Sequence, residues 1–151
     1  MVTVAVEGET RIARPLDVVQ AQFVDMAHHE AAGVHANLRV GNVRPQPGGC
    51  RFTGQRHIFG MVQEDEIEVA RGADGGSTLR SLGGSNAGLL ITQRFTADGP
   101  AATRVHIRVE LPLPGLRALL APLVRLGLRR DVAAALAEDR ADLEGPGYAR
   151  T

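Results

Sequence analysis

Most of this chain alternates apolar and polar residues with the period of a β-strand, and only its C-terminal part changes to helical spacing. In the segment 103–111, every odd-numbered position from Val105 to Leu111 is apolar, and the even-numbered positions carry Arg, His or Glu. A sheet of such strands is apolar on one face only and needs a cover there. The helical segment 116–144 is the available cover. The pattern therefore predicts an α+β fold, with an antiparallel sheet packed against a long C-terminal helix.

The other elements are identified by the same two periods and by the turns between them. The expected strands are separated by turns rich in Gly, Pro and Asp and cover 2–12, 36–44, 51–59, 61–71, 78–82, 89–96 and 103–111. A first helix is expected to begin at Arg14-Pro15, because Pro suits the first turn of a helix. Its buried face is expected to carry Leu16, Val19 and Phe23.

The C-terminal helix is expected to be uneven along its length. Pro122 and Gly127 should kink or interrupt its first half, whereas one apolar stripe runs from Leu128 to Leu143 in the second half. Neither an internal repeat nor a linker divides the chain. We therefore expect a single domain over residues 1–151, with about seven strands in its sheet.

The charged residues and the single cysteine exclude several kinds of chemistry. The 17 acidic residues balance 17 basic ones, and every basic residue is Arg, so Schiff-base and Lys-dependent phosphate-loop chemistry are excluded. A net charge of zero and an aromatic content of 3% argue against a nucleic-acid partner. Cys50 is alone, which excludes an intrachain disulfide, a Cys-rich zinc site and an all-Cys iron–sulfur cluster.

The chain shows no sign of export or of membrane insertion. Its start lacks the basic segment followed by an apolar segment that marks a signal peptide. Its apolar runs are all shorter than the roughly 20 residues that a membrane helix needs. We therefore expect a cytoplasmic protein with no membrane partner.

Two polar residues interrupt the apolar face of the expected strand 61–71. Gln63 and Asp65 share the parity of its apolar positions, so both are expected to point inward. A buried carboxylate needs a hydrogen-bonding partner or a ligand, which makes Asp65 and Gln63 candidate catalytic residues. A register break or a bulge is the alternative, and it would turn both side chains into water.

A second inward carboxylate is expected on the C-terminal helix. Asp139 lies seven residues after Val132 and four before Leu143, which places it near the centre of the apolar stripe. It is therefore expected to face the sheet, where it either acts on a ligand or pairs with a basic residue such as Arg94. Among the basic residues, Arg94 is the one that we place inside.

Three of the five histidines lie within a short segment after the first helix. His28, His29 and His35 lie there close to the carboxylate of Asp25, in a stretch that we expect to be irregular. Neutral imidazoles with a carboxylate are the ligands of zinc sites and of two-His-one-carboxylate iron centres. Solvated or helix-capping histidines are the alternative. A site here requires the first helix to break after Phe23, because an unbroken helix would turn Asp25 away from the buried face.

The order of elements and the residues Arg14-Pro15-Leu16-Asp17-Val18-Val19 at the start of the first helix resemble the helix-grip fold of the START, polyketide cyclase and pollen-allergen superfamily. The resemblance covers nearly the whole chain. It implies a curved antiparallel sheet wrapped around a long C-terminal helix. It also implies a cavity between sheet and helix, which in this superfamily usually takes an apolar small molecule. The fold alone does not specify a reaction.

The pattern Asp25-x2-His28-x6-His35, with carboxylates far downstream, also resembles the catalytic domain of Rieske-type non-haem iron oxygenases. By this resemblance His28, His35 and Asp139 would bind the metal, and Asp25 would orient a histidine. The two histidines are two residues further apart than in that family, so His29 is the alternative to His28. The sequence holds no Rieske cluster domain, and one Cys cannot build its cluster. The metal would then be Fe with a separate electron-transfer partner, or an ion such as Zn acting as a Lewis acid.

Three functions remain open at this point. The first is an enzyme that acts on an apolar or aromatic, polyketide-like substrate through the metal ion. The second is a metal-free cyclase or dehydratase, in which Asp65, Gln63, Arg94 or a His transfers protons. The third is a non-catalytic carrier of a hydrophobic ligand. Polar residues on buried faces favour an enzyme, and a homodimer is an assembly that we consider.

Overall fold

The computed structural model describes residues 1–58 and 60–148. Within them, seven antiparallel strands form one sheet in the order β1-β7-β6-β5-β4-β3-β2. The strands are β1 (Val2–Ile12), β2 (Arg39–Gln46), β3 (Gly49–Ile58), β4 (Met61–Arg71), β5 (Ser77–Gly84), β6 (Leu90–Ala97) and β7 (Thr103–Leu113). The helices are α1 (Leu16–Val24), α2 (Met26–Ala32), the 3-10 helix η1 (Gly115–Leu120) and α3 (Ala121–Glu144). The predicted α+β fold is confirmed.

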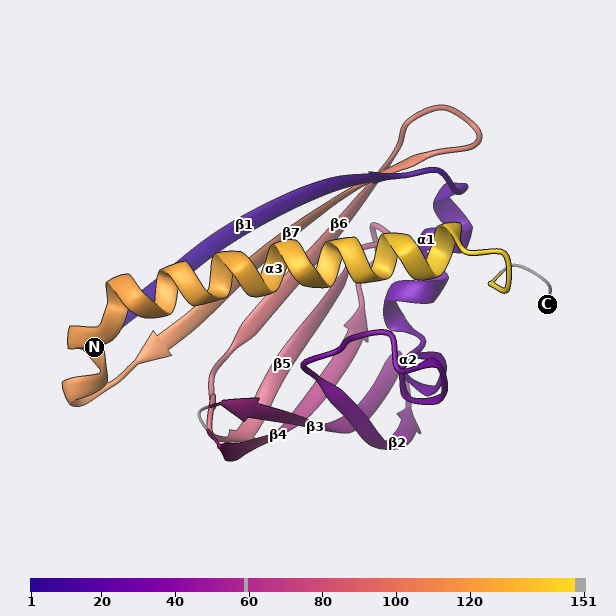
Figure 1. Ribbon diagram of the computed structural model, residues 1–151. Helices are drawn as coiled ribbons and strands as arrows, with labels where there is room; N and C mark the ends of the chain where they lie inside the picture. Colours follow the sequence, from indigo (N-terminus) through magenta and orange to yellow (C-terminus); the bar gives the residue numbers. More distant parts are fainter. Residues whose placement is uncertain (59, 149–151) are drawn as a thin grey trace.

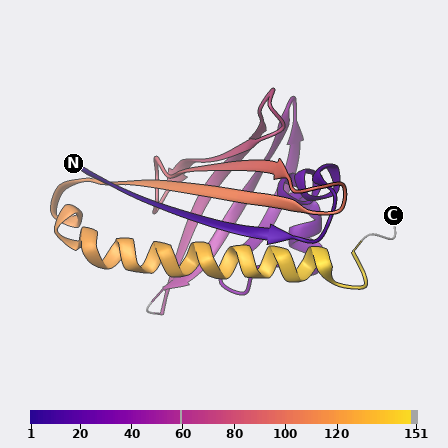
Figure 2. The ribbon, with the colours of Figure 1, turned by 90° about the horizontal axis from the view of Figure 1, so that it is seen from above.

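The sheet curves around α3, which crosses one of its faces (Figure 1). Seen from above, α3 runs along one side of the sheet over nearly the full length of β1 and β7 (Figure 2). The two short helices α1 and α2 lie near the C-terminal end of α3 (Figure 1). This arrangement brings the His-rich segment of the chain close to the second half of α3.

The contact between β1, β7 and α3 holds the larger part of the core. The inward positions of β7 from Val105 to Leu111 are buried as predicted, and so are Val132, Leu136 and Leu143 on α3. Each such side chain contributes about 1.5–3 kcal/mol of burial free energy. A smaller group of buried residues lies beneath α2 and consists of Met26, Val40, Cys50, Phe52, Ile67 and Val69.

Gly8 allows α3 to approach the backbone of β1. A Cβ atom at this position would lie 2.5 Å from Cγ1 of Val132 and 3.1 Å from Cδ1 of Leu136. Val132 is β-branched, so it has little rotamer freedom with which to move away. The helix therefore rests directly on the strand at Gly8.

The first half of the C-terminal helix differs from the prediction. The helix α3 runs without interruption from Ala121 to Glu144, so the break expected near Gly127 does not occur. Pro122 lies in the first turn of α3, where its missing N–H removes no helical hydrogen bond. The change in geometry comes earlier, where η1 ends at Leu120. Among the described helices, none has the length and apolarity needed to cross a membrane.

Gly8→Ala should lower the free energy of unfolding by about 1–3 kcal/mol, because the added methyl group forces Val132 and Leu136 away from β1. Urea denaturation followed by circular dichroism measures the loss. Gly127→Ala is the matched control, since a Cβ there meets nothing within 4 Å and Ala is the better helix former. Equal stabilities of Gly8→Ala and the wild type would contradict the close contact.

Candidate functional site

A break between two short helices determines where the histidines lie. Helix α1 ends at Val24, and Asp25, with φ −83° and ψ 79°, separates it from α2. The carboxylate of Asp25 accepts a hydrogen bond from the backbone N–H of His28 at 3.0 Å and so caps α2. Gly33 ends α2 in the left-handed conformation, with φ 58°. The break that a site here requires is present, but the segment 26–32, expected to be irregular, is helical.

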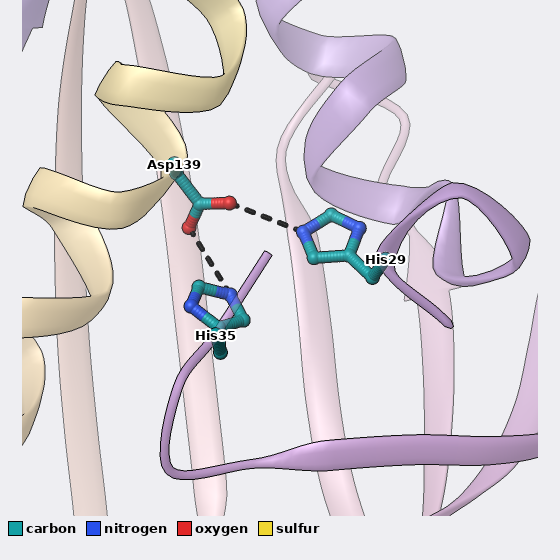
Figure 3. A group of neighbouring side chains, drawn as sticks. All are labelled: His29, His35 and Asp139. Atoms are coloured by element: carbon teal, nitrogen blue, oxygen red, sulfur yellow. Dashed lines mark hydrogen bonds and ion pairs between the residues drawn. The ribbon is translucent and has the colours of Figure 1, made fainter. Parts of the chain in front are cut away.

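The carboxylate of Asp139 is the centre of the site. The side chain is 4% exposed and faces inward from α3, as its position in the apolar stripe predicted. Its Oδ1 accepts hydrogen bonds from Nε2 of His29 at 3.1 Å and from Nε2 of Gln22 at 3.0 Å. Its Oδ2 lies 3.5 Å from Nε2 of His35. Figure 3 shows the two imidazoles on either side of the carboxylate, with His29 on α2 and His35 on the loop that follows.

The Nδ1 atom of each of these histidines lies within hydrogen-bonding distance of an oxygen acceptor. Nδ1 of His29 lies 2.8 Å from the carbonyl oxygen of Asp25, and Nδ1 of His35 lies 3.1 Å from a carboxylate oxygen of Glu138. Both Nδ1 atoms must carry a proton in order to donate these bonds. Both Nε2 atoms are therefore directed at Asp139. A neutral ring offers an Nε2 lone pair there, and a charged ring offers an N–H donor.

The surroundings of His29 favour its protonated form. Burial by itself lowers the pKa of the ring, but the hydrogen bond and charge of Asp139, the carbonyl of Asp25 and the charge of Asp142 outweigh burial. The net effect raises the pKa of His29 above its ordinary value of 6.5. A neutral ring would oppose its Nε2 lone pair to the carboxylate, which is unfavourable in a buried site. Below the raised pKa, His29 and Asp139 therefore form a buried ion pair.

His28, which the resemblance to oxygenases assigned as a metal ligand, lies outside this group. Its Nε2 is 2.8 Å from Oδ2 of Asp142, and its ring meets that of Tyr148 edge-on at a centroid distance of 5.1 Å. The geometry favours His29, the alternative residue, because its Nε2 points at Asp139. Asp25 lies close by, but it orients His29 through its backbone carbonyl and not through its carboxylate.

Gln22 is a site residue that the sequence analysis missed. Its side chain is fully buried, and its Nε2 donates to Asp139 and to Asp142, each at 3.0 Å. Within the part of the chain that the structure describes, its Oε1 has no hydrogen-bond partner. Gln22 lies three residues after Val19 and one before Phe23, so the helical period of α1 would have identified it as buried.

Asp65 points inward as predicted, but it contacts a turn and not the histidines. Its carboxylate accepts hydrogen bonds from Oγ of Ser81 at 3.1 Å, from the backbone N–H of Asn86 at 2.7 Å and from Nδ2 of Asn86 at 3.1 Å. Gln63 is half-buried, and its Oε1 accepts from the same Asn86 amide at 3.3 Å. These bonds hold the turn between β5 and β6 against β4. A catalytic role for Asp65 and Gln63 stays a prediction.

Arg94 is exposed on β6, so its placement inside is wrong, and the alternative in which it pairs with Asp139 does not hold. The basic residue beside the site is Arg56 on β3, whose Nη2 lies 2.6 Å from Oδ2 of Asp131 on α3. Arg56 has the strand parity of Phe52, which is fully buried. The alternation along β3 therefore contained the signal that would have identified Arg56.

A cavity of about 200 Å³ lies between α3 and the sheet and reaches the polar group. Its apolar wall includes Leu79, Leu89, Ile91, Ile107, Val109 and Leu128. His35, Glu138 and Asp139 line its polar end, and Arg56 and Asp131 line another part of the wall. A mostly apolar molecule that fits this space would meet an imidazole and a carboxylate.

A larger, open groove of about 520 Å³ lies on another side of α3, against β1. Surface charges such as Glu7 and Arg129 line it together with alanines of α3. None of His29, His35 and Asp139 takes part in its lining. The smaller cavity is therefore the candidate site, because it alone of these two spaces meets the buried polar groups.

Neither a scan against protein families nor a search of curated proteins finds a match for this sequence. Solved structures do match it. The Zhui aromatase/cyclase from Streptomyces sp. R1128 has a TM-score of 0.82 at 13% identity, over 95% of this chain and 94% of that one. The protein TTHA0849 from Thermus thermophilus has a TM-score of 0.79 at 19% identity, over 92% and 96%. A START superfamily protein from Mycobacterium smegmatis has a TM-score of 0.69 at 15% identity, over 89% and 92%.

The chain has the helix-grip fold. The resemblance of its element order to START-like and polyketide cyclase-like proteins is confirmed at the level of the fold. These neighbours lend no support to the resemblance to Rieske-type oxygenases. Since identities of 13–19% show the fold alone, the reaction must be argued from the site.

The stability that His29 contributes should fall as the pH rises. Because the folded-state pKa of His29 is raised, this contribution is complete below the unfolded-state value of 6.5 and is lost as the pH passes through the folded-state value. Urea unfolding of the wild type and His29→Gln at about pH 6 and about pH 9 measures the difference. His57→Gln, exposed on β3, is the control. A cost of His29→Gln that stays constant or grows with pH would contradict the buried ion pair.

Proposed function

We propose that this helix-grip protein is an enzyme that binds an apolar, aromatic or polyketide-like molecule in its cavity and transfers protons with the group formed by His29, His35 and Asp139. The observation that carries the proposal is a buried carboxylate held between two histidines at the wall of an apolar cavity. The fold supports the substrate class, since the Zhui aromatase/cyclase and the di-domain ARO/CYC BexL share it. We name these three residues the His–Asp–His group.

The His–Asp–His group has the parts that a cyclisation needs. Ring closure of a polyketone begins when a base removes a proton from a carbon next to a carbonyl, and the attacked carbonyl oxygen then takes up a proton. His35 lines the cavity, and because its Nδ1 donates to Glu138, the free lone pair lies on Nε2. This Nε2 accepts the first proton and returns it to the new alkoxide. Asp139, held in place by His29 and Gln22, stabilises the imidazolium that exists between these two steps. No proton is gained or lost over the two steps.

Asp139→Asn should lower the rate at which the protein cyclises a poly-β-ketone thioester by about a hundredfold or more. The same variant should bind the uncharged fluorescent probe N-phenyl-1-naphthylamine as tightly as the wild type, because the apolar wall is unchanged and the probe carries no charge on which Asp139 would act. Product formation is followed by chromatography, and probe binding by fluorescence titration. Circular dichroism shows whether the variant is folded, and His35→Gln provides a second substitution in the same group.

A matched pair of alanines separates binding from catalysis. Ala135 lines the cavity, so Ala135→Phe should lose both probe binding and turnover, whereas Ala133→Phe, on the other side of α3, should keep both. A wild type that binds the probe but forms no more product than buffer would identify a carrier and contradict the catalytic part of the proposal. A probe that binds Ala135→Phe normally would contradict the cavity.

Metal-dependent catalysis is a second candidate function of the same group. His29, His35 and Asp139 offer ligand atoms that all lie within 4.8 Å of one another. The Nε2-to-carboxylate distances of 3.1 and 3.5 Å approach the spacing of ligands around a tetrahedral ion with bonds of about 2.0–2.2 Å. The bonds from Nδ1 to Asp25 and Glu138 are of the kind that orients metal-binding histidines. This donor set suits Zn or Fe, and an Fe oxygenase would also need an electron-transfer partner.

Reconstitution with Zn²⁺, or with Fe²⁺ without air, followed by desalting tests this second candidate. The wild type should then retain stoichiometric metal, measured by inductively coupled plasma mass spectrometry. His29→Ala and Asp139→Ala should bind about a hundredfold more weakly, because each removes a ligand. His28→Ala is the matched control and should keep the metal, since His28 bonds to Asp142 instead. A wild type that stays free of metal, or an equal loss in His28→Ala, would contradict the metal site.

A further inference from the structure

A row of leucines is exposed on η1 and the first turns of α3. Its members are Leu116, Leu119, Leu120, Leu123 and Leu126, named here the leucine surface. Their exposed fractions run from 47% to 84%. They line neither the cavity nor the groove. Exposed leucines concentrated in one short segment mark a surface that contacts an apolar partner.

The leucine surface is separate from the core. Ala121, Val124 and Leu128 pack against the core from the same part of α3. Helical spacing places Leu123 and Leu126 on the opposite side of the helix. The expectation that this segment covers the sheet therefore holds for one of its faces, and the other face is left to solvent.

Four arginines accompany the leucine surface. Arg117, Arg125, Arg129 and Arg130 are exposed, and the segment 114–130 contains no acidic residue. The segment therefore carries four positive charges in a chain whose net charge is zero. Within residues 1–58 and 60–148, none of the four forms an ion pair. By helical spacing Arg130 shares the side of Leu123 and Leu126, whereas Arg129 lines the groove against β1. The end of the molecule that carries the leucine surface is thus basic as well as apolar.

The leucine surface lies at the end of the molecule away from α1 and α2 (Figure 2). Val2 pairs with Leu113, just before η1, so the start of the chain lies beside this surface. Met1 and Val2 are both exposed. Figure 1 shows the N-terminus next to the point where η1 leads into α3. The leucine surface therefore lies on the outside of the molecule, where η1 leads into α3, and not at the bottom of a groove.

We propose that the leucine surface docks on an anionic lipid bilayer. Leucines on one side of a helix enter the boundary between headgroups and acyl chains, and arginines beside them bind lipid phosphates. The attraction of the four positive charges to the negative surface potential adds to the binding. This docking is independent of the reaction in the cavity and goes beyond the proposed function. It replaces the expectation, drawn from the sequence, of no membrane partner.

A second copy of the chain is a poorer occupant of the same surface. In a twofold dimer the same patch faces itself, so the four arginines of each copy would meet. Like charges placed together across an interface oppose association. No carboxylate of the segment 114–130 is present to offset them. The homodimer considered from the sequence would therefore have to use another face.

The absence of Trp from the sequence gives a direct test of docking. In Leu123→Trp, the single indole should shift its emission to shorter wavelength with vesicles of equal parts phosphatidylcholine and phosphatidylglycerol. Brominated acyl chains should quench that emission. Leu82→Trp is the matched control, because Leu82 is also an exposed leucine but lies on β5, and it should show neither effect.

Co-sedimentation with vesicles measures the affinity. The wild type should bind the anionic vesicles in low salt and bind pure phosphatidylcholine vesicles about a hundredfold more weakly. Leu119→Ser combined with Leu123→Ser should weaken anionic binding about tenfold or more, because two side chains no longer insert. Arg130→Gln should weaken it about fivefold, because Arg130 shares the side of Leu123 and Leu126, whereas Arg94→Gln on β6 should leave it unchanged.

Three results would overturn the proposal. The first is a wild type that stays in the supernatant with anionic vesicles in low salt. The second is a double leucine variant that is folded and binds as the wild type does. The third is a dimer in solution that the same double variant converts to a monomer, since a second copy would then cover the leucine surface. None of these results bears on ligand binding in the cavity, which the alanine pair tests separately.

Discussion

The charge on Asp139 is buried within the apolar stripe of α3. Side chains from α1, α2 and the loop after α2 compensate this charge. An unpaired carboxylate there would cost several kcal/mol, on the order of the whole stability of a small domain. Three groups from the first third of the chain remove this cost, namely the amide of Gln22 and the imidazoles of His29 and His35. The break at Asp25 is what turns His29 toward the carboxylate. The backbone conformation at Asp25 thus determines which groups surround the buried carboxylate.

The spacing of apolar residues predicted those features that depend on one element alone. It could not predict which side chains meet where two elements pack together. The strands, the long helix and the inward direction of Asp139 could all be predicted, because each depends on spacing along one element. The choice between His28 and His29 could not, since adjacent positions on a helix differ in direction by about 100° and the start of α2 decides which one faces α3. Arg94 was misplaced because it was assigned to the inside without a test of the alternation along β6, where Gln93 takes the inward position.

The low identity to structures of the same fold has a physical explanation. Many sequences satisfy the alternation and the helical stripe that build a curved sheet around a helix, so a TM-score of 0.82 coexists with 13% identity. The site depends on a few side chains at positions that the fold leaves free. In this chain, those positions hold a carboxylate between two histidines, and no lysine is present anywhere. Under the proposed function, proton transfer in the cavity would therefore fall to imidazoles and carboxylates.

The contact at Gly8 makes the two sides of α3 unequal for a molecule approaching the cavity. On the β1 side, Val132 and Leu136 are packed against strand backbone, and a ligand could pass only by lifting the helix. On the other side, Arg56 and Asp131 bridge strand and helix through one partly exposed ion pair. Such a pair separates at little cost in water, whereas packed side chains do not. Packed side chains therefore join α3 to β1 on one side of the helix, and an ion pair that water reaches joins it to β3 on the other.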